Sequence, residues 1–188
     1  MGIRNVLFGR KKLSEPKADR LFALSTATVT LETELGLKTA GKAAITFKPL
    51  SSGDFDRIDN DVESLIKAAA RSSGSEVERK SDQYGFEWLI VHDPDIEDQV
   101  TSVHAVASEL TAQGFGSQLL AAAFLFDGGE HPVYFIYGFK LGTFWPFIPI
   151  GDQKRDNATE LELKAKLEKE LPIEQDLTRW LALFDAPI

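Results

Sequence analysis

The order of apolar and polar residues predicts strands and helices in alternation. Apolar residues recur with a two-residue period in residues 27–31 and again in residues 43–47, and Gly36 and Gly41 lie between the two segments. A two-residue period is typical of a half-buried strand, and glycines favour turns. These segments are therefore predicted to form a β-hairpin, preceded by a short helix that begins at residues 14–16.

Two longer segments have the period of an amphipathic helix. Apolar side chains in residues 55–69 and residues 96–110 fall on one helical stripe each. Asp95 is the expected N-cap of the second helix and Gly114 its expected end. A further helix is predicted over residues 157–171, followed by a short amphipathic turn.

The remaining apolar segments predict four strands and one further extended stretch. One lies around Val77, a second over residues 84–91 and a third over residues 133–139. Residues 119–126 are apolar on both faces, as expected of a strand buried in the middle of a sheet. In the stretch that follows residue 139, two prolines lack the backbone donor of a central strand, so this stretch is predicted to be an edge strand or an extended lid.

Together these elements predict a single α+β domain over residues 14–188. The expected architecture is a mostly antiparallel sheet of about six strands, built from successive ββα units with the helices on one face. A ferredoxin-like β-α-β-β-α-β core over residues 42–126, with an added hairpin and C-terminal helices, is the alternative. Residues 1–13 are predicted to be a flexible basic N-terminus.

Charge and composition narrow the possible partners. The net charge is −8, although residues 1–20 hold six Lys/Arg against two acidic residues. An acidic protein lacks the cations that neutralise phosphates, so nucleic acid is not expected as a partner. Residues 1–12 combine basic and apolar side chains and allow at most a peripheral membrane contact. The chain has no cysteine and no long apolar run, so a cytoplasmic location, including the inner face of the cytoplasmic membrane, is expected.

No motif for catalysis or for a cofactor is complete. Residues 36–43 match a phosphate-binding loop except at the last position, where Ala43 replaces the required hydroxyl and a strand replaces the required helix. The three histidines share no ligand spacing with a carboxylate. We therefore expect no metal, no cofactor and no catalytic residue, and a protein that is not an enzyme.

An aromatic stretch, residues 134–150, is the first candidate for binding a partner. Its rings belong to the core if they face inward, and to an interface if several face outward. The residues chosen as partner contacts, together with a nearby arginine, are Tyr137, Phe144, Trp145, Phe147 and Arg155.

The second candidate is the start of the helix predicted over residues 157–171. Asn157 and Glu160 have the spacing of a capping box, with Asn157 as the cap. Arg155 is unfavourable near a helix N-terminus, so it should have a carboxylate partner such as Asp152 or Asp156. Alternatively, Asp156, Asn157 and Glu160 form a polar site beside Arg155.

Several ordered motifs resemble the PspA-associated protein PspAB family. They are LFAL (21–24), VTLE (29–32), FKP (47–49), YGFEW (84–88), GFGSQLL (114–120), GTFWPF (142–147), RDN (155–157) with Glu160, and the tail around Trp180. The resemblance implies an accessory role beside PspA, the coiled-coil protein of the phage-shock envelope-stress system, and brings no catalytic residues.

Three hypotheses follow from the sequence. The first is a non-enzymatic adaptor that binds a PspA-like coiled-coil protein. The second is a small-molecule binder or enzyme with a site formed by Arg155, Asp156 and Glu160 beside Tyr134 or Tyr137. The third is a chaperone-like protein that binds an extended peptide at a sheet edge.

Overall fold

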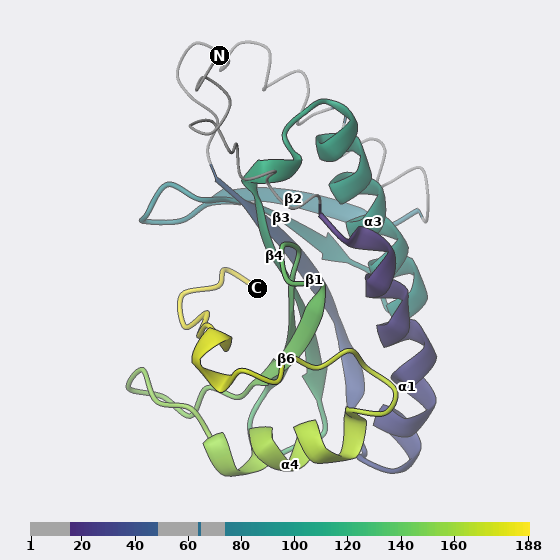
Figure 1. Ribbon diagram of the computed structural model, residues 1–188, viewed down its shortest axis with the longest axis vertical. Coiled ribbons are helices and arrows are strands. Elements are labelled where there is room, and N and C mark those ends of the chain that lie inside the picture. Colours follow the sequence, from purple (N-terminus) through teal and green to yellow (C-terminus); the bar gives the residue numbers. More distant parts are fainter. Residues whose placement is uncertain (1–15, 49–63, 65–73) are drawn as a thin grey trace, which may run out of the picture.

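The computed structural model describes residues 16–48, 64 and 74–188. These residues contain a six-stranded antiparallel sheet (Figure 1). The strand order is β2-β3-β1-β4-β5-β6. The strands are β1 (Lys38–Phe47), β2 (Glu76–Ser81), β3 (Glu87–His92), β4 (Leu119–Asp127), β5 (Val133–Gly138) and β6 (Thr143–Phe147). The prediction of a single α+β domain with an antiparallel sheet is confirmed. The predicted basic N-terminus and most of the helix predicted over residues 55–69 lie outside the described residues.

The segment predicted as the first strand of a hairpin is a helix, α1 (Ala23–Thr33), so that prediction was wrong. Leu24, Ala27 and Leu31 are fully buried, whereas Val29 is 69% exposed. The two-residue alternation arose because the apolar Val29, which fits the strand pattern, lies on the outer surface of the helix. Helical spacing between the buried leucines outweighs the strand propensity of these β-branched residues, because the stripe packs against the sheet.

The sixth strand comes from the aromatic stretch instead. β6 lies at the edge of the sheet and contains Pro146, which agrees with the expected edge position. The order of β2, β3, β1 and β4, with antiparallel pairing throughout, is that of the ferredoxin-like alternative. The β5-β6 hairpin extends this core beyond β4.

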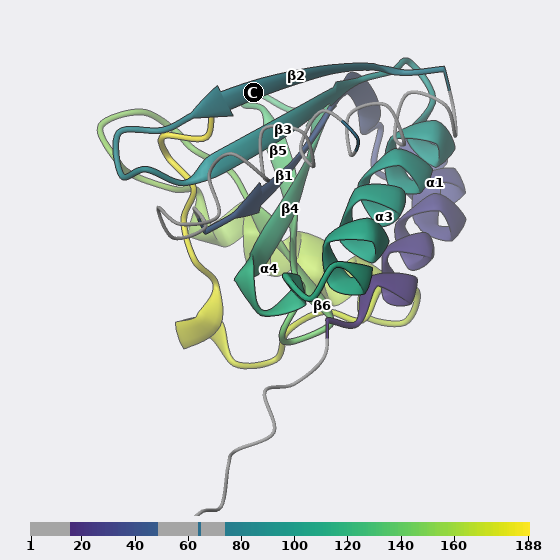
Figure 2. The same ribbon diagram turned by 90° about the horizontal axis from the view of Figure 1, so that it is seen from above.

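Helices α1 and α3 (Ile96–Ala112) pack against the same face of the sheet (Figures 1 and 2). Asp95 caps α3 as predicted, since its carboxylate accepts from the backbone N–H of Glu97 at 2.7 Å. Helix α4 (Asn157–Leu167) lies beside β6 and buries Leu163 and Leu167. It is shorter than predicted.

The opposite face of the sheet is covered differently. The C-terminal segment lies there, on the side away from α1 and α3 (Figure 1). A small cluster of Ala44, Trp88 and Ile90 on this face packs against Leu183 and Ile188. Among the described residues, the partly buried apolar side chains that pack against this cluster come from the C-terminal segment.

Candidate functional site: an apolar groove beside the C-terminal segment

The aromatic residues chosen from the sequence lie mostly in the core. Tyr137, Phe144 and Phe147 are fully buried, and Trp145 is nearly so. The hydroxyl of Tyr137 donates to the carbonyl oxygen of Lys17, and burial raises the pKa of this phenol. These rings therefore offer little surface to a partner in this conformation, and their predicted partner contacts stay a prediction.

Arg155 is fully engaged inside the molecule. Its Nε donates to the carboxylate of Glu160 at 2.8 Å. Nη1 donates to the carbonyl of Trp180 at 2.9 Å and Nη2 to that of Pro146 at 3.2 Å. The guanidinium also lies 5.2 Å from the ring centre of Phe147. One side chain thus ties β6, α4 and the C-terminal segment together.

Glu160 is the carboxylate partner of Arg155, in place of the expected Asp152 or Asp156. Its side chain is 1% exposed and also accepts from the backbone N–H of Ile148 at 2.8 Å. Burial raises the pKa of this carboxyl, and the hydrogen bonds from Arg155 and Ile148 oppose that rise. Glu160 is consequently a buried half of an ion pair and does not cap the helix.

The N-cap of α4 is Asp156, one residue before the predicted cap Asn157. Its carboxylate accepts from the backbone N–H of Thr159 at 3.1 Å and from the hydroxyl of the same residue at 2.6 Å. Those bonds lower the pKa of Asp156. The predicted capping box was wrong because Glu160 turns inward to Arg155.

An apolar groove of about 730 Å³ lies on the face that carries the C-terminal segment. Its lining includes Trp88, Ile136 and Trp145, together with the small residues Ala121 and Gly138. Residues 181–186 also line it. A groove of this size with a mostly apolar lining is typical of a binding site.

A glycine in β5 leaves room for an indole beside the groove. A Cβ atom at Gly138 would lie 3.0 Å from Cζ3 of Trp145, so the indole would have to shift by a few tenths of an ångström beside a larger residue. Trp145 in turn donates from Nε1 to the carbonyl of Leu181 at 3.0 Å. The glycine therefore allows the indole to join the sheet to the C-terminal segment.

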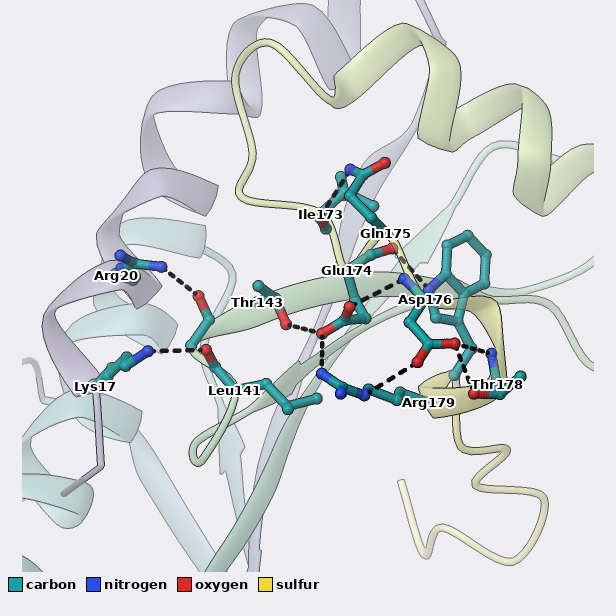
Figure 3. A network of polar contacts seen from close by, with 12 residues as sticks. Lys17, Arg20, Leu141, Thr143, Ile173, Glu174, Gln175, Asp176, Thr178 and Arg179 are labelled. Atoms are coloured by element: carbon teal, nitrogen blue, oxygen red, sulfur yellow. Dashed lines mark hydrogen bonds and ion pairs between the residues drawn. The ribbon is translucent and has the colours of Figure 1, made fainter. Parts of the chain in front are cut away.

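The C-terminal segment is fixed before it reaches the groove by a polar network around Glu174 (Figure 3). Thr143 donates to the carboxylate of Glu174 at 3.1 Å, and the same carboxylate accepts from the backbone N–H of Asp176 at 3.0 Å. Asp176 accepts from the backbone N–H of Thr178 and pairs with Arg179 at 3.2 Å. This network positions residues 177–181 against β6.

Two exposed side chains flank the groove. Tyr84 is 67% exposed and Leu181 is 64% exposed, and both line the groove. Lys48 and Lys140 also line it and are exposed. Sequence patterns did not reveal this site, because its residues come from five strands and the C-terminal segment and converge only in the folded chain.

Asp82 fixes the orientation of one indole in the groove. It accepts from Nε1 of Trp88 at 3.0 Å and from the backbone N–H groups of Tyr84 and Phe86, both at 2.9 Å. Partial burial raises the pKa of this carboxyl, but the hydrogen bonds from Trp88 and the backbone outweigh that effect, and the pKa is lowered.

The pKa of Asp82 is lower in the folded protein than its ordinary value of 3.8. Asp82 therefore stabilises the fold above pH 3.8, and this contribution is lost as the pH falls through the folded-state pKa. We expect Asp82→Ala to reduce the free energy of unfolding by about 1 kcal/mol near neutral pH and to weaken the acid dependence of stability. Urea unfolding across the acidic range measures both effects. The exposed Glu130→Ala is the control, and equal acid dependence in wild type and Asp82→Ala would contradict the assignment.

The polar site expected around Arg155 does not coincide with the groove. None of Arg155, Asp156, Glu160, Tyr134 and Tyr137 lines it. Among the described residues, no group of three or more acidic or histidine side chains is arranged to hold a metal ion. No helix in the described part of the chain is both long and apolar enough to cross a membrane.

The sheet edge that β6 presents is partly covered. The backbone N–H of Phe144 donates to the carbonyl of Pro172 at 2.8 Å. The backbone N–H of Glu174 donates to the carbonyl of Phe144, also at 2.8 Å. The β2 edge carries the charged side chains Glu78 and Lys80, which disfavour pairing with another strand. Neither edge favours the peptide-binding hypothesis.

The family model for PspA associated protein B matches residues 1–188, the whole chain. The chain belongs to the PspAB family. Its role is therefore linked to PspA, and the resemblance found in the sequence motifs is confirmed. No curated protein and no solved structure matches the chain significantly.

Proposed function

We propose that this PspAB family member is a non-enzymatic adaptor that binds a PspA-like coiled-coil protein through the apolar groove. The observation that supports this proposal is the groove itself, which lies on the sheet face opposite α1 and α3 in a chain from a PspA-associated family. The adaptor would act in a PspA-type envelope-stress response, in the cytoplasm or at the inner face of the cytoplasmic membrane.

The shape and chemistry of the groove suit the apolar face of an amphipathic helix. Such helices insert apolar side chains at helical spacing into grooves of this kind. Tyr84 and Leu181 would contact the helix from the rim, and Trp88 and Trp145 would form the floor. The exposed Lys48 and Lys140 would favour a partner helix whose apolar stripe is flanked by carboxylates.

Substitutions at the rim test this proposal. We expect Leu181→Asp and Tyr84→Asp each to weaken binding to a purified PspA-like partner about 10- to 30-fold, because a charge replaces an apolar contact with the partner helix and would have to be desolvated. Calorimetric titration measures the affinity. Both side chains are exposed, so stability should change little.

Leu161→Asp is the matched control, because Leu161 is an exposed leucine on α4 that does not line the groove. It should bind the partner like wild type. If the control weakens binding as much as the rim variants do, or if wild type does not bind at all, the proposal is wrong.

A further inference from the structure

Residues 182–188 are held to the sheet by few polar contacts. They form neither a helix nor a strand. Among the described residues, this segment donates one backbone hydrogen bond, from the N–H of Ala186 to the carbonyl of Leu183 at 3.2 Å. Lys80 donates to the carbonyl of Pro187 and Gln83 to the carboxylate of Asp185, each at 3.4 Å from an exposed donor. Contacts of this length and exposure contribute little stability.

The residues immediately before this segment are held firmly. The carbonyl of Trp180 accepts from Arg155 at 2.9 Å, and that of Leu181 accepts from Trp145 at 3.0 Å. The indole of Trp180 donates to the carbonyl of Glu174 at 3.0 Å. The chain therefore has a fixed point at Trp180 and Leu181. The segment after it is held mainly by apolar packing, including the ring of Phe184, whose centre lies 5.1 Å from that of Phe147.

This segment, which has few polar contacts, covers an apolar surface. Ala44, Trp88 and Ile90 are almost completely buried, and Leu183 and Ile188 pack against them. Trp88 also lines the groove, as does Leu183, so the covered surface and the groove are continuous. If the segment moved away, one apolar strip would extend from Trp145 across the sheet to Ile90.

We propose that residues 182–188 form a displaceable strap that occupies part of the partner's binding surface in the free protein. The apolar face of the partner helix replaces the strap and then covers Ala44, Trp88 and Ile90 in its place. This inference rests on the proposed function and adds its regulation. Molecules with a closed strap do not bind the partner. The apparent dissociation constant is therefore the intrinsic constant divided by the fraction of molecules in which the strap is open.

Two strap variants and one peptide test the inference. The first variant ends at Ala182 and keeps both carbonyl contacts of Trp180 and Leu181. The second is full-length Ile188→Asp, which puts a charge against the covered cluster. We expect both to bind the PspA-like partner about 10-fold more tightly than wild type, because competition by the strap is removed or weakened. Leu161→Asp is again the control and should leave the affinity unchanged.

A fluorescent peptide of residues 181–188 gives an independent measurement. It should bind the variant that ends at Ala182 more tightly than it binds the full-length chain, and addition of the partner should release it. Unchanged or weaker partner binding by both strap variants would overturn the strap while leaving the groove as the site. Simultaneous binding of peptide and partner would do the same. Absence of partner binding by every chain would overturn the proposed function and the strap's displacement together.

Discussion

Arg155→Ala is expected to lower the free energy of unfolding by about 3–5 kcal/mol, because it leaves the carboxylate of Glu160 buried without its cation. The side chain of Glu160 is 1% exposed. The same substitution removes the donors to the carbonyls of Trp180 and Pro146. Urea unfolding followed by tryptophan fluorescence measures the change.

The pH dependence of the variant is a second readout. Burial raises the pKa of Glu160 above its ordinary value of 4.5, and Arg155 opposes that rise. Without Arg155 the folded-state pKa should rise further. A carboxyl with a raised folded-state pKa favours folding most when it is protonated, so the deficit of Arg155→Ala should shrink as the pH falls towards 4.5.

Two further variants separate the ion pair from the loss of side-chain packing. Lys164→Ala removes a pair with Glu168 at 3.4 Å on the surface of α4 and should cost less than about 1 kcal/mol. Adding Glu160→Gln to Arg155→Ala should restore part of the stability, since it replaces the unpaired charge with a neutral amide. A deficit in Arg155→Ala that is below about 1 kcal/mol and independent of pH would show that the buried pair contributes little.

Trp180→Ala is expected to destabilise the fold by about 3–5 kcal/mol, as truncations of buried aromatic side chains do. Trp180 is 8% exposed and its indole donates to the carbonyl of Glu174. Without the ring, residues 177–181 lose their main apolar contact with the body of the protein. The strap then loses its fixed point, so partner binding should change together with stability.

Leu177→Ala is the matched control for Trp180→Ala. Leu177 begins the short 3₁₀ helix Leu177–Arg179, which directly precedes Trp180, and it is about half exposed. Its truncation should cost less than about 1 kcal/mol. Equal stabilities for the two variants would mean that the C-terminal segment is not docked as the structure shows, and a loss below 1 kcal/mol for Trp180→Ala would support the same conclusion.

The α1 region shows where sequence patterns and the fold diverge. The alternation of apolar and β-branched residues predicted a strand over residues 27–31, whereas Leu24, Ala27 and Leu31 are buried on one side of a helix. Both periods fit so short a segment. The sheet decided between them, because it accepts a row of small and branched apolar side chains at helical spacing.

The segment around Arg155 shows a different kind of divergence. A helix start there was predicted correctly, but the cap is Asp156 and Glu160 is buried. Local spacing describes which hydrogen bonds a helix end can make on its own. It does not include Pro146 and Trp180, whose carbonyls hold Arg155 and thereby draw Glu160 inward.

The sequence by itself determined the α+β class, the cap and buried stripe of α3, the central strand β4, the edge position of β6 and the family of the chain. These features depend on neighbours along the chain or on ordered motifs. The tertiary structure alone decided the groove, the position of residues 182–188 against the sheet and the role of Arg155. Each of these brings together residues from strands and segments far apart in sequence, and a one-dimensional pattern does not contain their distances.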